Sequence, residues 1–306
     1  MGNVFVVLTP FIHGLVKLAG LTPQTIEIEP GTIMNIWVPK ETVTKKNQTI
    51  TYVPPTKPAV LFLHAFTMDG IHTWFLQVFA LSREYSLYVP DLLFFGGSIT
   101  DRNERSPSFQ AEFVAKGLGK LGVEKVTLVG LSYGGAVGFE MAKLYPKLVK
   151  AMVVSATVVE LTESISLESY KQIGVTKWSE FLLPKTVEEF RRLFSFGFHK
   201  FPAFPDFFCR DILQTMYHNR RERTELLESL VITDKDATTS YNNYSQEIHM
   251  VWGDDDKIFG LDLAMTMKTR LGNKTTLDLI KDAGHLLPIE RPLCYNKRLK
   301  CILEHV

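Results

Sequence analysis

The chain has 306 residues, 45% of them hydrophobic and 22% charged, which is the ordinary balance of a globular protein with a sizeable core. Its 34 basic and 33 acidic side chains give a formal net charge of +1, so the charge balance indicates no nucleic-acid partner. The three cysteines, Cys209, Cys294 and Cys301, form neither a paired framework nor a metal-binding spacing. This pattern favours a reducing, cytoplasmic compartment, and we expect no metal or cofactor.

The N-terminal stretch 4–20 is apolar, but Pro10, His13 and Lys17 interrupt it. It is too broken for a membrane-spanning helix, and it lacks the basic region that precedes a secretory signal. We expect a helix that packs on the body of the protein. The alternative is a weak contact with a membrane surface.

The next segments are β-prone. Residues 25–29 and 33–38 flank the turn pair Pro30–Gly31, which predicts a hairpin, and a polar loop follows with one more edge strand at 49–53. From there apolar runs alternate with segments of helical spacing, which predicts an α/β protein with a doubly wound, mostly parallel sheet. The predicted strands are 59–63, 86–90, 126–129, 149–155, 248–252 and 276–280, and the predicted helices are 73–82, 109–121, 136–144, 261–271 and 292–303.

The alternation stops between residues 156 and 246. This segment contains helical stretches separated by Pro and Gly, and it therefore predicts a helical cap (lid) domain, 156–246, inserted into a core made of 1–155 and 247–306. Phenylalanine occupies seven of the fifteen positions from 194 to 208, so we expect these rings to form the core of the cap and, in part, a greasy pocket. From their position alone, Phe204 and Phe208 are the predicted substrate-binding residues.

A dinucleotide-like pattern, G-x-G-x-x-G, occurs at 117–122. The nucleotide fingerprint follows a strand and opens a helix. Here the pattern closes a predicted helix and precedes a strand, so it indicates a helix C-terminus and a linker.

The chemistry-bearing pattern is G-L-S-Y-G at 130–134. The apolar strand 126–129 precedes it and a helical pattern follows it, which puts Ser132 at the apex of a tight turn. A serine hydroxyl becomes a nucleophile when a base takes its proton, and the base needs a third group to hold its tautomer.

Candidates for both partners follow later in the chain. Strand 248–252 ends at Gly253 and the carboxylates 254–256 come next, while strand 276–280 leads to His285. Of the eight histidines, only His285 combines a position after the acids with a strand-end loop that leads into a helix. We therefore predict His285 as the general base.

A tetrahedral intermediate needs N–H donors for its oxyanion. One is the backbone N–H of Tyr133, the residue after the nucleophile. The second is expected from the loop after strand 59–63, which reads His64-Ala65-Phe66, with the Phe66 N–H as the candidate. His64 itself is interpreted as a structural hydrogen-bonding residue.

Five motifs stand out along the chain: LFLHAF at 61–66, VPDLLFFGGS at 89–98, GLSYGG at 130–135, WGDDDKIF at 252–259 and AGHLLPIERP at 283–292. Together they resemble the α/β-hydrolase superfamily, and in detail its plant branch called monoacylglycerol-lipase-like or epoxide-hydrolase-like. The resemblance implies the α/β-hydrolase fold with a catalytic Ser132, Asp256 as the acid and His285. Two departures stand out: Ala65 replaces the glycine of a His-Gly pair, and the nucleophile is serine where true epoxide hydrolases use aspartate.

The sequence thus predicts a serine hydrolase that cleaves a lipophilic carboxylic ester through an acyl-enzyme. Two alternatives stay open because they share the fold and site. One is lyase or cyclase chemistry on a plant metabolite, and the other is a ligand receptor that retains the triad. The sequence identifies neither the natural substrate nor the oligomeric state.

Overall fold

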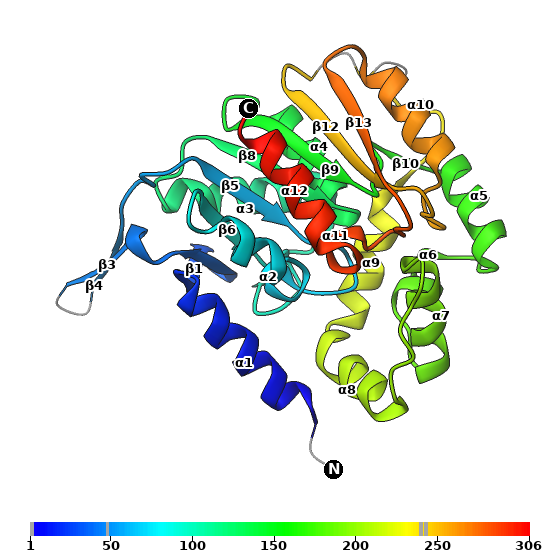
Figure 1. The fold of residues 1–306 in the computed structure, drawn as a ribbon, viewed down its shortest axis with the longest axis horizontal. Coiled ribbons are helices and arrows are strands. Elements are labelled where there is room, and N and C mark those ends of the chain that lie inside the picture. Colours follow the sequence, from blue (N-terminus) through cyan, green and yellow to red (C-terminus); the bar gives the residue numbers. More distant parts are fainter. Residues whose placement is uncertain (1–2, 47–48, 239–240, 242–243) are drawn as a thin grey trace.

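The computed structural model describes residues 3–46, 49–238, 241 and 244–306. Its centre is a nine-stranded sheet in the order β1-β2-β6-β5-β8-β9-β12-β13, with β7 paired to β2. Pairs from β6 to β13 are parallel, and β2 pairs antiparallel with β1, β6 and β7. Figure 1 shows helices on both faces of this sheet. The predicted doubly wound α/β fold is confirmed.

Except for the two-residue strand β7, which was not predicted, the strands of the sheet match the predicted runs within a few residues. Both faces of the central strands are covered, and this is why they read as continuous apolar runs. The bounds are β1 Leu21–Glu29, β2 Thr32–Pro39, β5 Ala59–Leu63, β6 Ser86–Pro90, β7 Ile99–Thr100, β8 Val126–Leu131, β9 Val149–Ser155, β12 Glu247–Gly253 and β13 Thr275–Ile280.

Two small sheets lie outside the main one. β3 (Val43–Lys46) and β4 (Thr49–Tyr52) form an antiparallel pair, so the predicted edge strand at 49–53 exists but does not extend the main sheet. β10 (Leu161–Thr162) pairs in parallel with β11 (Val231–Ile232). The sequence missed this second pair because two-residue strands carry no readable alternation.

Two of the helices that flank the sheet begin at side-chain caps that the sequence shows. Asp69 accepts a hydrogen bond from the N–H of His72 at the start of α2, and Ser106 caps α3 in the same way. α3 ends within the dinucleotide-like pattern, where Gly122 takes a positive φ of 71°, so that pattern is a helix end. The bounds are α2 Gly70–Leu81, α3 Pro107–Lys120, α4 Tyr133–Leu144, α10 Leu261–Leu271, α11 Leu287–Glu290 and α12 Pro292–Leu303.

The segment between β9 and β12, called the cap segment below, consists of five described helices with β10 and β11. Residues 239–240 and 242–243 of the predicted cap lie outside the described residues. Helical spacing in the sequence indicates stretches at 186–194, 206–218 and 222–230, which correspond to the last three of these helices and not to the first two. The five helices are α5 Glu163–Ile173, α6 Trp178–Leu182, α7 Val187–Gly197, α8 Asp206–Met216 and α9 Arg220–Leu230.

The N-terminal helix α1 (Phe5–Leu18) lies along the outside of the body, with its first turn near α8 (Figure 1). Phe5, Ile12 and Val16 form its buried face. As predicted, α1 packs on the body. In the described ranges, no helix combines the length and apolarity that crossing a bilayer requires.

Candidate active site

Ser132 lies between the end of β8 and the start of α4, in a backbone conformation that side chains rarely adopt. Its φ is 53° and its ψ is −117°. Thr157 holds this turn, because its hydroxyl donates a 2.7 Å hydrogen bond to the Ser132 carbonyl. A strained residue persists only where its surroundings over-determine it. The turn therefore presents the Ser132 side chain in one fixed direction.

The glycines around Ser132 are required by close backbone approach. A Cβ on Gly134 would lie 2.3 Å from the carbonyl oxygen of Leu63, and one on Gly130 would lie 2.8 Å from the Cα of Gly135. Backbone cannot yield as a flexible side chain can, so larger residues are excluded at both positions. The glycines bring α4 against β5 and place the oxyanion loop after β5 beside Ser132.

Three side chains from distant parts of the chain form a hydrogen-bonded row. The Ser132 Oγ lies 2.8 Å from Nε2 of His285, and Nδ1 of His285 lies 3.0 Å from Oδ2 of Asp256. The Asp256 side chain is fully buried and that of His285 is 6% exposed. This geometry is that of a nucleophile, a base and an orienting acid. The structure brings together the three residues that the sequence singled out.

The three neighbouring aspartates have different surroundings. Oδ1 of Asp256 accepts hydrogen bonds from the backbone N–H groups of Ile258 and Phe259, at 2.9 and 3.0 Å. Asp255 instead contacts His199 at 2.9 Å and Lys257 at 3.1 Å. Only Asp256 reaches His285, which agrees with the choice made from the resemblance.

The two predicted oxyanion donors lie beside Ser132. Phe66 and Tyr133 both line the cavity there. Within the described part of the chain, neither backbone N–H has a hydrogen-bond acceptor. Two N–H groups without partners next to a nucleophile are available to a developing oxyanion.

The His64 ring supports the oxyanion loop after β5 through two hydrogen bonds to the backbone. Its Nδ1 lies 2.8 Å from the Ala65 carbonyl, and its Nε2 accepts a 2.9 Å bond from the Leu92 N–H. Nδ1 therefore carries the proton. Complete burial lowers the pKa of His64 to about 4, so the ring stays neutral and structural.

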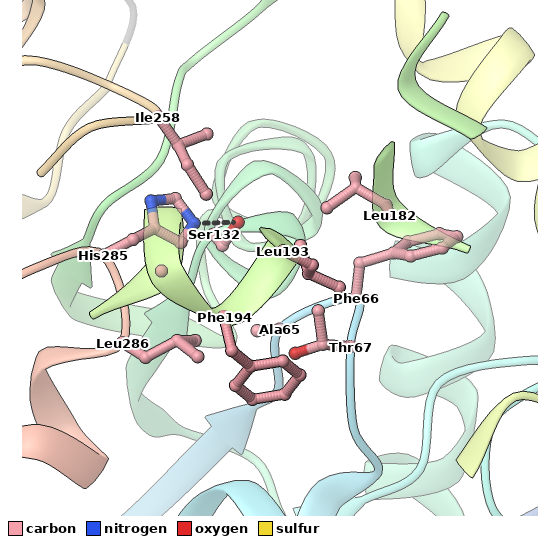
Figure 2. A pocket seen from close by; sticks show the side chains of 11 residues that line it. Ala65, Phe66, Thr67, Ser132, Leu182, Leu193, Phe194, Ile258, His285 and Leu286 are labelled. Atoms are coloured by element: carbon pink, nitrogen blue, oxygen red, sulfur yellow. Dashed lines mark hydrogen bonds between the residues drawn. The ribbon is translucent and has the colours of Figure 1, made fainter. Parts of the chain in front are cut away.

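Two adjoining cavities meet at Ser132 and His285, and both are lined mainly by apolar side chains. Their volumes are about 20 and 40 Å³. Figure 2 shows the smaller cavity, with the Ser132 hydroxyl directed at His285. Both cavities are lined by Phe66, Ser132, Leu182, Ile258 and His285, the smaller also by Ala65, Thr67, Leu193, Phe194, Gly197 and Leu286, and the larger also by Tyr133, Ala136, Thr157, Val158, Leu161, Trp178, Leu227, Leu230 and Phe259.

The prediction that Phe204 and Phe208 line the pocket is wrong, because neither side chain lines either cavity. The ring of Phe208 lies 4.8 Å from that of Phe204 and 5.7 Å from that of Phe5 of α1, measured between ring centroids. Of the seven phenylalanines, Phe194 is the one at the cavity, because α7 presents Leu193, Phe194 and Gly197 there. The buried residues of α7 follow the spacing i, i+3, i+4, i+7 from Phe190. This helical spacing is visible in the sequence and could have identified Phe194 as an inward-facing residue.

The cap segment is also attached to the loop of the predicted base. One carboxylate, that of Glu290, accepts backbone hydrogen bonds from Gly284 at 2.8 Å and from His199 and Lys200 at 3.0 Å. The Gly197 carbonyl accepts from the Leu286 N–H at 2.8 Å. Glu290 therefore holds the residue before His285 together with His199 and Lys200, which follow shortly after α7, in one arrangement.

Replacing Glu290 by Gln is expected to lower the free energy of unfolding by about 1–2 kcal/mol, because an NH₂ group then faces at least one of three backbone N–H donors, two of which make half-buried bonds. Urea denaturation followed by fluorescence measures this. Glu188→Gln, at an exposed position of α7, is the matched control. Equal stability of the two variants would contradict the role of Glu290.

Comparison with known proteins identifies the class. The model of the alpha/beta hydrolase fold family matches residues 58–292, most of the chain. The chain belongs to this family.

The individual relatives have low sequence identity to this chain. The chain is 26% identical to Lipase 3 of Moraxella sp. (strain TA144) over 243 residues, covering 77% of this chain and 74% of that protein. It is 28% identical to Lipase 1 of Psychrobacter immobilis over 240 residues, covering 76% and 72%. It is 23% identical to Epoxide hydrolase 4 of Mus musculus over 280 residues, covering 81% and 73%. These relatives are bacterial and mammalian, so the resemblance to a plant branch stays a prediction.

Among solved structures, a putative lipase from Acinetobacter baumannii AYE superposes with a TM-score of 0.79 at 17% identity, covering 96% of this chain and 95% of that chain. This likeness shows the fold alone.

Proposed function

We propose that this protein is a serine hydrolase that cleaves a lipophilic carboxylic ester, such as a monoacylglycerol-like or specialised-metabolite ester. The observation that carries the proposal is the hydrogen-bonded row from Ser132 through His285 to Asp256, at the junction of two apolar cavities. The lipases among the relatives support an ester substrate.

The reaction follows from the row. His285 Nε2 takes the proton of the Ser132 hydroxyl as its oxygen attacks the ester carbonyl, and Asp256 holds the proton on Nδ1. The N–H groups of Phe66 and Tyr133 stabilise the oxyanion. Collapse expels the alcohol, which receives the proton from His285. A water molecule, deprotonated by His285, then hydrolyses the acyl-enzyme and frees Ser132.

Epoxide hydrolysis is disfavoured although one relative carries that name. By the resemblance described above, epoxide hydrolases use an aspartate as nucleophile, and this chain has Ser132 at that position. A serine in this position suits acyl transfer, in which the acyl-enzyme is an ester that water can cleave.

Turnover separates the proposal from its two alternatives. A hydrolase releases equal amounts of acid and alcohol over many turnovers, which mass spectrometry of the products detects. A receptor that retains the triad would stop after about one turnover, and a lyase or cyclase would give a product without added water. Either result would overturn the proposed ester hydrolysis.

The acyl-chain preference is expected to depend on the cavities. Each buried methylene contributes ~0.8 kcal/mol, so two extra carbons raise kcat/KM by roughly tenfold where the transition state keeps the contact. We expect kcat/KM to rise across p-nitrophenyl esters from acetate to hexanoate. Leu182→Ala flattens the rise, because Leu182 lines both cavities.

Phe204→Ala is the control, because Phe204 lines neither cavity and its loss leaves the slope unchanged. A flat or falling chain-length profile in the unchanged protein would reject the lipophilic ester. It would point to a small ester or to one of the two alternatives.

A further inference from the structure

Helix α1 is apolar on the face that it turns away from the protein. Val7, Phe11 and Leu18 are 72%, 61% and 85% exposed. Their spacing, i, i+4 and i+11, places them on one line along the helix, opposite the buried Ile12 and Val16. α1 carries four of the exposed large apolar side chains among the described residues, while every other element carries at most one. A helix that is apolar on opposite faces is buried on both.

The position of α1 on the body is well fixed. The Thr9 hydroxyl lies 3.2 Å from Nε2 of His72, and Nδ1 of that ring lies 2.8 Å from a carboxylate oxygen of Asp69. At the other contact, the Val4 N–H donates a 2.7 Å bond to Asp211 of α8. The outward face of α1 is therefore exposed although the helix is already packed on the body of the protein.

An unbroken row of aromatic rings connects α1 with the active-site cavity. Phe5 of α1 lies 5.7 Å from Phe208, which lies 4.8 Å from Phe204, and Phe204 lies 5.6 Å from Phe201. Phe201 lies 5.4 Å from Phe194, and Phe194 lines the cavity at Ser132. The phenylalanine-rich part of the cap segment thus extends from the N-terminal helix to the nucleophile.

We propose that the outward face of α1, formed by Val7, Phe11 and Leu18 with Val6 (70% exposed) at its edge, docks on a lipid surface, while the phenylalanine-rich part of the cap segment packs against Phe5 on the buried face of the same helix. The docking surface rests on the proposed function, because a lipophilic ester is concentrated in lipid. Its 14 residues give α1 a length of about 21 Å, shorter than a hydrocarbon core of ~30 Å. The helix lies in the interface and does not span it.

A lipid surface fits this face better than a second copy of the chain. Four side chains expose on the order of 400 Å², about half of what each partner buries in a stable protein interface. A lipid surface needs no such area and no matching shape. The charge of α1 also fits a lipid surface. Lys17, in the last turn, is the only charged residue of α1; it is exposed, and its positive charge attracts anionic headgroups.

The experiment is co-sedimentation of the full chain with phosphatidylcholine vesicles, with and without phosphatidylserine. We expect the unchanged protein to bind both and to bind the anionic vesicles more tightly. Phe11→Glu and Leu18→Glu are expected to weaken binding roughly tenfold or more. Leu293→Glu is the matched control, because Leu293 of α12 is 84% exposed but lies on another helix, and this change leaves binding unaltered.

Two results would overturn the lipid surface. One is equal sedimentation of the unchanged protein and of Leu18→Glu with vesicles, or the absence of binding by both. The other is a dimer of the unchanged protein in analytical ultracentrifugation that Leu18→Glu dissociates, which would assign the face to a second copy.

Hydrolysis of p-nitrophenyl acetate in the absence of lipid keeps the two proposals apart. Leu18→Glu is expected to retain this activity, because Leu18 is remote from Ser132 in the fold and contributes nothing to either cavity. Binding to vesicles without any ester turnover would reject the proposed function and leave the surface in place. Turnover without binding would do the reverse.

Discussion

Ser132→Ala is expected to lower kcat/KM for ester substrates by roughly 10⁴-fold or more, because the change removes the atom that forms the acyl-enzyme. The Ser132 hydroxyl is the group within 2.8 Å of Nε2 of His285. The same variant is expected to lose covalent labelling by a fluorophosphonate. Intact-protein mass spectrometry measures the adduct directly.

The control for this experiment is Ser195→Ala. Ser195 lies on the exposed side of α7, and its hydroxyl donates to the Arg192 carbonyl. This variant is expected to label and to turn over like the unchanged protein. Persistent labelling of Ser132→Ala would reject Ser132 as the nucleophile and, with it, the proposed mechanism.

Asp256→Asn is expected to lower turnover by up to about 10⁴-fold, through the tautomer of His285. The backbone N–H groups of Ile258 and Phe259 both donate to Oδ1 of Asp256, so the amide oxygen of the variant keeps that position. Its NH₂ group replaces Oδ2, which lies 3.0 Å from Nδ1 of His285 against 3.1 Å for Oδ1, and a donor at this position favours an Nδ1 that accepts. The imidazole proton of His285 then lies on Nε2. Nε2 can therefore no longer accept the proton of the Ser132 hydroxyl.

Asp255→Asn is the neighbouring control. Asp255 contacts His199 and Lys257 and does not reach His285, so we expect a change in turnover of less than about tenfold. Steady-state kinetics with a short-chain p-nitrophenyl ester compares the two variants. If Asp255→Asn were the more damaging change, Asp256 would not be the acid.

Local sequence patterns were sufficient to predict the strands and helices of the core of this protein. The strand before Ser132, the turn and the helix after it are specified by adjacent residues, because apolar runs, glycines and helical spacing act over a few positions. The acid and the base were also readable, since both follow strands whose carboxyl ends meet at one edge of a parallel sheet. The choice of Asp256 among three aspartates came from a resemblance and not from the pattern itself.

The cap segment was less readable. α6 has only five residues, and α5 has a polar sequence with three buried positions, so neither gives a strong periodic signal. The phenylalanines illustrate the limit, because composition indicated that the rings pack together but not which ring reaches the cavity. Phe194 does so, whereas Phe208 packs against Phe5, about two hundred positions earlier in the chain.

The sequence by itself determined the fold class and the proposed nucleophile and base, because these depend on short motifs and on the order of strands in a sheet. The tertiary structure alone decided which side chains line the two cavities, that Glu290 joins the cap segment to the loop of His285, and that α1 presents a second apolar face outward. Such contacts join residues far apart in the chain. Their partners are selected by packing in three dimensions, which leaves no periodic trace in the sequence.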